Sequence, residues 1–416
     1  MKKTAIVGGG LHFGINSVTQ PFFALFAAEL GASTSSIGVM LMLRAVLPLF
    51  IAMPAGQLID RLGAPHMLRM GNALTIVSLV LMVWSPNLTV LTVSQLLIGA
   101  GAMIVQSSLQ VVVSEGGKAE RERDISRYSA WCAGGSMVGP LVGGGVVTAV
   151  SSLTALGWMG TVSDGYRAAF AAALLAAALF GFVFRWASRH VEKRPWFGPE
   201  LRSVVRPREI ADSYLSGAHL IKHPGVQFGL VGTFLIHFIQ SIWVGFFPLY
   251  LDTLGYSAFL ISALVSLRGL AGLTSRLFIG RLTKRWPHRS ILLVAGCVAA
   301  LSLIVLPILD WHVAPLALVS FLLGSAVGVN MPISTMIMVD EDSSGERGKI
   351  MGLRLLANRS SQIAAPVVFG GIGQLFGLGV AFYAGGGLLL ASLLGFGLYR
   401  QRRSGHYLIT RMEVEK

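Results

Sequence analysis

Twelve apolar stretches, each about long enough to cross a lipid bilayer, occupy most of this chain of 416 residues. A bilayer core cannot hydrogen-bond unpaired backbone groups, so such stretches cross it as helices. With 54% hydrophobic and only 12% charged residues, the composition excludes a set of soluble domains. The sequence therefore predicts an all-α membrane protein with spans near 5–29, 36–59, 68–85, 88–113, 127–150, 165–187, 224–250, 257–280, 289–309, 314–338, 350–376 and 378–400.

An internal repeat divides these spans into two sets of six. The segment 26–61 recurs 224 residues later, at 250–285, without a gap. Matched positions include Leu30-Gly31 with Leu254-Gly255, Ile37 with Ile261, Arg44 with Arg268, Gly56 with Gly280 and Arg61 with Arg285. We therefore expect an N-terminal six-helix bundle at 1–187, a linker at 188–222, a C-terminal six-helix bundle at 223–400 and a tail at 401–416.

The basic residues predict the orientation of the chain. They gather in alternate loops, which predicts that both termini and these loops are cytoplasmic. They include Lys2, Lys3, Arg61, Arg69, Lys118, Arg121, Arg185, Arg189, Arg281, Lys284, Arg347, Lys349 and the tail from Arg400, whereas only Arg167 lies on the other side. The net charge of +14 then reflects topology and attraction to anionic lipid rather than nucleic acid. We expect a monomer in the cell (inner) membrane.

A glycine-bounded stretch, Gly56-Gln57-Leu58-Ile59-Asp60-Arg61-Leu62-Gly63, separates the second and third spans. Its glycines favour a tight cytoplasmic turn. Asp60 and Arg61 can hold neighbouring helix ends together by charge and hydrogen bonding. A plain solvated turn is the alternative.

At Gly56, Leu58, Asp60, Arg61, Gly63 and Leu68 the chain resembles the signature loop of the major facilitator superfamily, in its twelve-span drug:proton antiporter branch. The resemblance extends over essentially the whole chain and implies two six-helix bundles that alternate between inward-open and outward-open states. In the family this loop controls that interconversion. Ala64 and Pro65 replace two basic residues of the family pattern, and His66 and Arg69 are candidates to substitute for them.

Span five carries the pattern G-x-x-x-G-P-x-x-G-G at Gly135, Gly139, Pro140, Gly143 and Gly144, which the family associates with antiporters. Small residues allow close helix approach, and proline bends a helix. We interpret the pattern as a pivot, with simple helix packing as the alternative. Span four keeps Gly99 and Gly101, but Gln95 stands where the family has an arginine linked to proton coupling.

Polar side chains within the spans predict a hydrated cavity, because such groups are costly in lipid and usually face the interior. Arg44 and Arg268 are equivalent by the repeat and lie roughly 18 Å along the helix from the loop glycine. They either pair with carboxylates such as Glu29 and Asp252 or contact substrate. The predicted cavity residues are Asn16, Gln20, Arg44, Gln106, Gln110, His237, Gln240, Arg268, Asn330, Asn358 and Gln362. Hydrogen bonding between helices is the alternative for any one of them.

The spans lack a central Asp or Glu, and His237 is interpreted as the deep group that titrates near neutral pH. A neutral, hydrogen-bonded core histidine is the alternative. The sequence suggests no metal, cofactor or catalytic residues, and hence no enzyme. We expect a secondary active transporter that exports a small amphipathic compound in exchange for protons. An organic-anion facilitator or symporter is the alternative, and a membrane sensor or integral-membrane enzyme is the alternative of another class.

Overall fold

The computed structural model describes residues 1–155, 162–189, 218–340 and 347–414. Within these ranges the backbone is almost entirely helical and contains no strand, which confirms the all-α fold. The α-helices are α1 (Lys2–Glu29), α2 (Thr34–Leu62), α3 (Ala64–Val83), α4 (Leu88–Ser114), α5 (Lys118–Ala155), α6 (Val162–Ala187), α9 (Pro224–Thr253), α10 (Ala258–Arg276), α11 (Ile279–Arg285), α12 (His288–Val305), α13 (Val313–Asp340), α14 (Arg347–Phe376) and α15 (Leu378–Val414).

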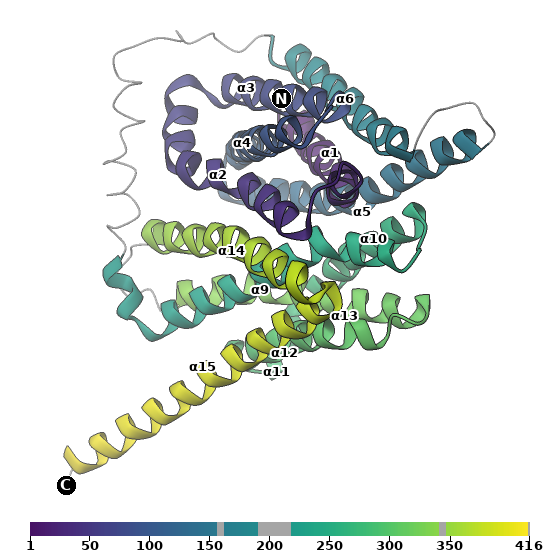
Figure 1. The fold of residues 1–416 in the computed structure, drawn as a ribbon. Helices are drawn as coiled ribbons and strands as arrows, with labels where there is room; N and C mark the ends of the chain where they lie inside the picture. Colours follow the sequence, from purple (N-terminus) through teal and green to yellow (C-terminus); the bar gives the residue numbers. More distant parts are fainter. Residues whose placement is uncertain (156–161, 190–217, 341–346, 415–416) are drawn as a thin grey trace.

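The helices form two groups. Figure 1 shows α1–α6, purple to teal, on one side of the molecule and α9–α15, green to yellow, on the other. In the first group α1 packs against α5 and α6, and α3 against α4; in the second, α10 and α12 pack against α13. The two bundles that the repeat predicts are consistent with this arrangement. The exact limits at 187, 223 and 400 stay a prediction, and most of the expected linker lies outside the described residues.

Ten of the described helices are long and apolar enough to cross a membrane. The two other long helices are α1 and α14, with 28 and 30 residues. Their hydropathy is lowered by polar side chains such as Asn16 and Gln20 in α1 and Arg354 and Arg359 in α14. Both helices pack within the bundles, so the twelve-span prediction is consistent with the structure.

The prediction of a turn over residues 56–63 is wrong. Helix α2 continues to Leu62, and only Gly63, with φ of +86°, separates it from α3. This positive φ is readily adopted by glycine. Gly56, Asp60 and Arg61 therefore lie on the last turns of a helix. The side chains of residues 52–57 and 60 lie outside what the structure describes, so the gating role of this stretch stays a prediction.

The second copy of this stretch folds differently. Helix α10 ends at Arg276, and a separate seven-residue helix, α11, holds Gly280, Lys284 and Arg285. The two copies therefore share a sequence pattern but differ in local structure.

The halves meet at one end of the molecule through α2 with α14 and α5 with α10. A Cβ added to Gly370 would lie 2.9 Å from the carbonyl oxygen of Thr34, and one added to Gly144 would lie 2.6 Å from Ser262 Cβ. Thr34 N also donates a 2.9 Å hydrogen bond to Gln374 Oε1. Thr34 begins α2 just after α1 ends, so the halves are closely packed on the side opposite the N-terminus.

Candidate functional site

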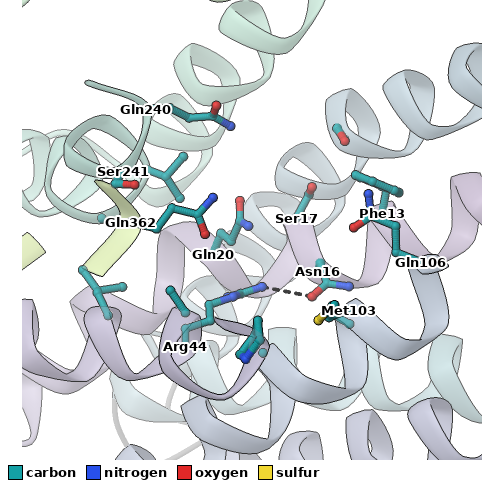
Figure 2. Close-up of a pocket in the computed structure, with 18 of the residues that line it drawn as sticks. Phe13, Asn16, Ser17, Gln20, Arg44, Met103, Gln106, Gln240, Ser241 and Gln362 are labelled. Carbon is teal, nitrogen blue, oxygen red and sulfur yellow. Dashed lines mark hydrogen bonds between the residues drawn. The ribbon is translucent and has the colours of Figure 1, made fainter. Parts of the chain in front are cut away.

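A cavity of about 340 Å³ lies between the two halves. Helices α1, α2, α4 and α5 of one half and α9, α10 and α14 of the other contribute to its wall, and Figure 2 shows their polar side chains converging. The lining comprises His12, Phe13, Asn16, Ser17, Gln20, Leu41, Arg44, Ala45, Pro48, Gly99, Ala102, Met103, Gln106, Ser136, Pro140, Gln240, Ser241, Val244, Gly245, Val265, Arg268, Gly269, Arg359, Gln362 and Pro366.

The structure brings seven of the predicted cavity residues together in this wall: Asn16, Gln20, Arg44, Gln106, Gln240, Arg268 and Gln362. It places four elsewhere. Gln110 is exposed one helical turn beyond Gln106, whereas His237 and Asn330 are buried away from the cavity lining. Asn358 lies behind the wall, where its Oδ1 accepts a 2.6 Å hydrogen bond from Gln362 Nε2.

Arg44 is held by an amide rather than by a carboxylate. Its Nη2 donates a 2.9 Å hydrogen bond to Asn16 Oδ1, drawn in Figure 2, and Asn16 Nδ2 donates to the carbonyl oxygen of His12 at 2.9 Å. Among the described residues no ion pair is recorded for Arg44 or Arg268. Because the partner is a neutral amide, the positive charge of Arg44 is not cancelled where it faces the cavity.

A glycine on the neighbouring helix positions each of the two equivalent arginines. A Cβ at Gly99 in α4 would collide with the backbone carbonyl of Arg44, and a Cβ at Gly324 in α13 would collide with that of Arg268. These contacts bring α4 against α2 and α13 against α10, so the repeat is visible in packing as well as in sequence. The Nε of Arg268 is buried and has no hydrogen-bond partner among the described residues.

Arg359 of α14 adds a third guanidinium to the wall. Its Nη1 donates a 3.0 Å hydrogen bond to Gln362 Oε1, which orients the Gln362 amide. Among the described lining residues there is no Asp or Glu. Charges in a partly desolvated cavity interact more strongly than they do in water, so the wall favours a negatively charged ligand.

One titratable residue of the wall, His12, was not identified from sequence. His12 is buried, with 4% exposed, and lies one helical turn before Asn16 on the same face of α1. That spacing of four residues was the available signal. His237, the histidine preferred from sequence, instead donates from Nδ1 to the carbonyl oxygen of Thr233 within its own helix at 2.8 Å.

Apolar side chains in the cavity wall include Phe13, Leu41, Met103, Val244 and Val265. Large aromatic residues nearby belong to the core instead. Trp243 and Phe247 are fully buried and stack with their ring centroids 3.8 Å apart. The cavity thus combines cationic groups with a comparable extent of apolar surface, which suits an amphipathic molecule.

The span-five pattern lies beside the cavity. Gly135, Gly139 and Gly143 face α1, where a Cβ on Gly139 would lie 2.7 Å from Gly14 O and one on Gly143 2.7 Å from Phe22 Cε2. Pro140 lines the cavity within a continuous α5. These glycines bring α1 and α5 into close contact. A pivoting role for the pattern stays a prediction.

Comparisons with known proteins agree with this architecture. Residues 5–366 match the family model of the Major Facilitator Superfamily. The multidrug resistance protein MdtG of Salmonella paratyphi A is 22% identical over 405 residues, which cover 93% of this chain and 92% of the relative. MdtG of Salmonella dublin is 23% identical over 401 residues, with the same coverage.

Solved structures share the fold at lower identity. A crystal structure of the peptide transporter POT in complex with sulfate aligns with a TM-score of 0.74 at 16% identity, covering 96% of this chain and 94% of that one. A crystal structure of a nucleoside transporter NupG variant aligns with a TM-score of 0.76 at 13% identity, covering 95% and 99%.

Proposed function

The chain belongs to the Major Facilitator Superfamily of secondary transporters, and we propose that it exports a small amphipathic organic anion by alternating access around the cavity between its halves. The observation that carries this proposal is the charge of the wall. Arg44, Arg268 and Arg359 line the cavity, and the described lining residues include no Asp or Glu.

An anionic group suits this wall for geometric as well as electrostatic reasons. A guanidinium presents several N–H donors in one plane, which match the two oxygens of a carboxylate or the oxygens of a phosphonate or sulfonate. Arg268 Nε, buried and without a hydrogen-bond partner in the part of the chain that the structure describes, is a donor of this kind. An amphipathic cation, by contrast, would enter a cavity of like charge without a compensating acid.

Export is favoured by the family relatives and by the membrane potential. The relatives at 22–23% identity are named multidrug resistance proteins. In a cell with a negative interior, each negative charge leaving gains about 2.3 kcal/mol per 100 mV. An anion therefore needs no exchanged proton in order to leave.

Symport of the anion with protons, an alternative left open by the sequence, is the second candidate. Among the described residues that line the cavity, His12 carries an imidazole, the side-chain type whose unperturbed pKa lies closest to neutral pH. Protonated His12 would add positive charge near Arg44 and would strengthen anion binding. This linkage couples a proton and an anion in the same direction, as in the symporter alternative, rather than by exchange.

Flux in proteoliposomes tests the proposal. The purified protein is reconstituted with potassium inside, and valinomycin sets the potential while a fluorescent sulfonate and a matched fluorescent quaternary ammonium compound are followed separately. Export of the sulfonate that rises with an inside-negative potential is expected, with little flux of the ammonium compound. Flux of the cation alone, driven by a pH gradient, would refute the anion assignment.

The proposed function also includes the orientation of the chain in the membrane and its oligomeric state. The basic loops and both termini are placed on the cytoplasmic side of the cell membrane, where positive residues accumulate. The protein is proposed to act as a monomer, because the cavity is completed by two halves of one chain.

A further inference from the structure

The segment 276–289, which joins two membrane spans of the second half, differs in charge from its own internal copy. The first copy, residues 52–61, contains Asp60 and Arg61 and is neutral, whereas the second, residues 276–285, contains Arg276, Arg281, Lys284 and Arg285 and carries +4. Three positions account for the change. Ala52, Gln57 and Asp60 are replaced by Arg276, Arg281 and Lys284.

These cations lie on an exposed surface between two candidate membrane spans. The candidate span of α10 ends at Arg276 and that of α12 begins at His288, so α11 lies at the boundary between them. Arg281, Lys284 and Arg285 are exposed, and no ion pair is recorded for them among the described residues. No acidic residue occurs between Asp252 and Asp310.

Apolar side chains accompany the cations. Leu277, Phe278 and Trp286 are 76%, 53% and 55% exposed, which is unusual for side chains of this kind at a water-facing turn. The guanidinium of Arg281 lies 5.8 Å from the centre of the Phe278 ring. Such a mixture of bare aromatic and basic residues is typical of a surface that sits among lipid headgroups.

A second cavity, of about 310 Å³, opens beside this surface. Arg276, Ile279, Met331 and Pro332 line it, so one cation borders a wall that is otherwise apolar. The cavity lies between the α10–α11 junction and α13. A bound molecule would need an anionic head for the arginine and an apolar portion for the rest of the wall.

We propose that the α10–α11 junction binds one anionic glycerophospholipid, with its phosphate held by Arg276, Arg281 and Lys284 and the start of an acyl chain in the cavity beside Ile279 and Met331. This site is separate from the transport cavity and does not depend on which substrate is carried. Phosphatidylglycerol is a suitable probe, because it combines a negative headgroup with two acyl chains.

Native mass spectrometry of the full chain, purified and titrated with defined lipid, tests the site. The parent is expected to retain phosphatidylglycerol in preference to phosphatidylcholine of the same chain length. The variant Arg276→Ala, Arg281→Gln, Lys284→Asp restores the residues of the first copy. In this variant the preference for phosphatidylglycerol should fall by roughly tenfold or more, because each basic residue near anionic lipid strengthens binding by about fivefold.

A charge-matched control is available on the same membrane side. Arg121→Asp with Arg127→Asp removes the same four units of charge from exposed positions on α5, and should change the preference less than about twofold. Arg281→Gln alone, at an exposed position, provides a mild variant if the triple variant does not fold. Unchanged preference in the folded variants would overturn the proposal. Equal retention of soluble glycerophosphoglycerol, which has no acyl chains, would overturn the assignment to a lipid.

Discussion

The guanidinium of Arg44 on α2 donates a 2.9 Å hydrogen bond to Oδ1 of Asn16 on α1. This bond fixes the direction of the side chain without neutralising its charge, because the acceptor is an amide. A carboxylate at the same place would form an ion pair and reduce the attraction for an anion. The Asn16–Arg44 pair thus orients a cation while leaving it available to substrate.

Replacing either of the equivalent arginines should weaken anion transport. Arg44→Gln and Arg268→Gln are each expected to raise KM for the fluorescent sulfonate by roughly tenfold to a hundredfold, the value of a charged hydrogen bond of about 1.5–3 kcal/mol. Initial rates of flux in proteoliposomes measure this. Arg185→Gln, at an exposed position on α6, is the control and should behave as the parent. A KM unaltered in both cavity variants argues against contact with the anion.

Two glycines of α5, two positions apart in the sequence, give a matched test of the α1–α5 contact. Gly143→Ala should lower stability by about 1–3 kcal/mol through overpacking, because its Cβ would lie 2.7 Å from Phe22 Cε2. A Cβ at Gly145 meets open space, so Gly145→Ala is the control. Thermal unfolding in detergent and flux report the effect. Equal Tm values for the two variants would contradict the packing described.

Neighbouring glycines of α14 test how the halves close. Gly370→Ala places a Cβ 2.9 Å from Thr34 O, whereas Gly371→Ala meets open space. Gly370→Ala is expected to disfavour the close packing of α2 on α14. It should shift the population towards conformations in which these two helices are farther apart. Spin labels at Ser36→Cys and Leu375→Cys, with Cys132 and Cys297 replaced, measure the distance. Identical distance distributions in the two variants would show that this contact does not hold the two halves closed.

The two deep histidines can be compared directly. If a proton accompanies the anion, His12→Gln should abolish the pH dependence of flux, since His12 lines the cavity. His237→Gln should retain that dependence, because His237 lies outside the cavity lining and bonds to Thr233 O. Flux measured as a function of pH distinguishes them. Loss of pH dependence in His237→Gln alone would restore the original assignment.

Much of the fold was predictable from sequence because it rests on local properties. A long apolar stretch must be helical in a bilayer, and a gapless repeat requires two similar halves. The equivalence of Arg44 and Arg268 follows from that repeat, and the structure shows it again in the contacts of Gly99 and Gly324. The local pattern was misleading where a glycine was taken to end a helix, since α2 continues past Gly56 to Leu62.

The composition of the cavity wall was decided by tertiary structure. Polar residues on a helix look alike in sequence whether they face a cavity, a neighbouring helix or the helix's own backbone. His12 and His237 show this, because both are buried and only His12 lines the cavity. Which face of α1 meets which face of α9 depends on packing between segments more than 200 residues apart. The sequence determined helices, halves and charge, whereas the packing of the two halves decided which of those charges meet in one cavity.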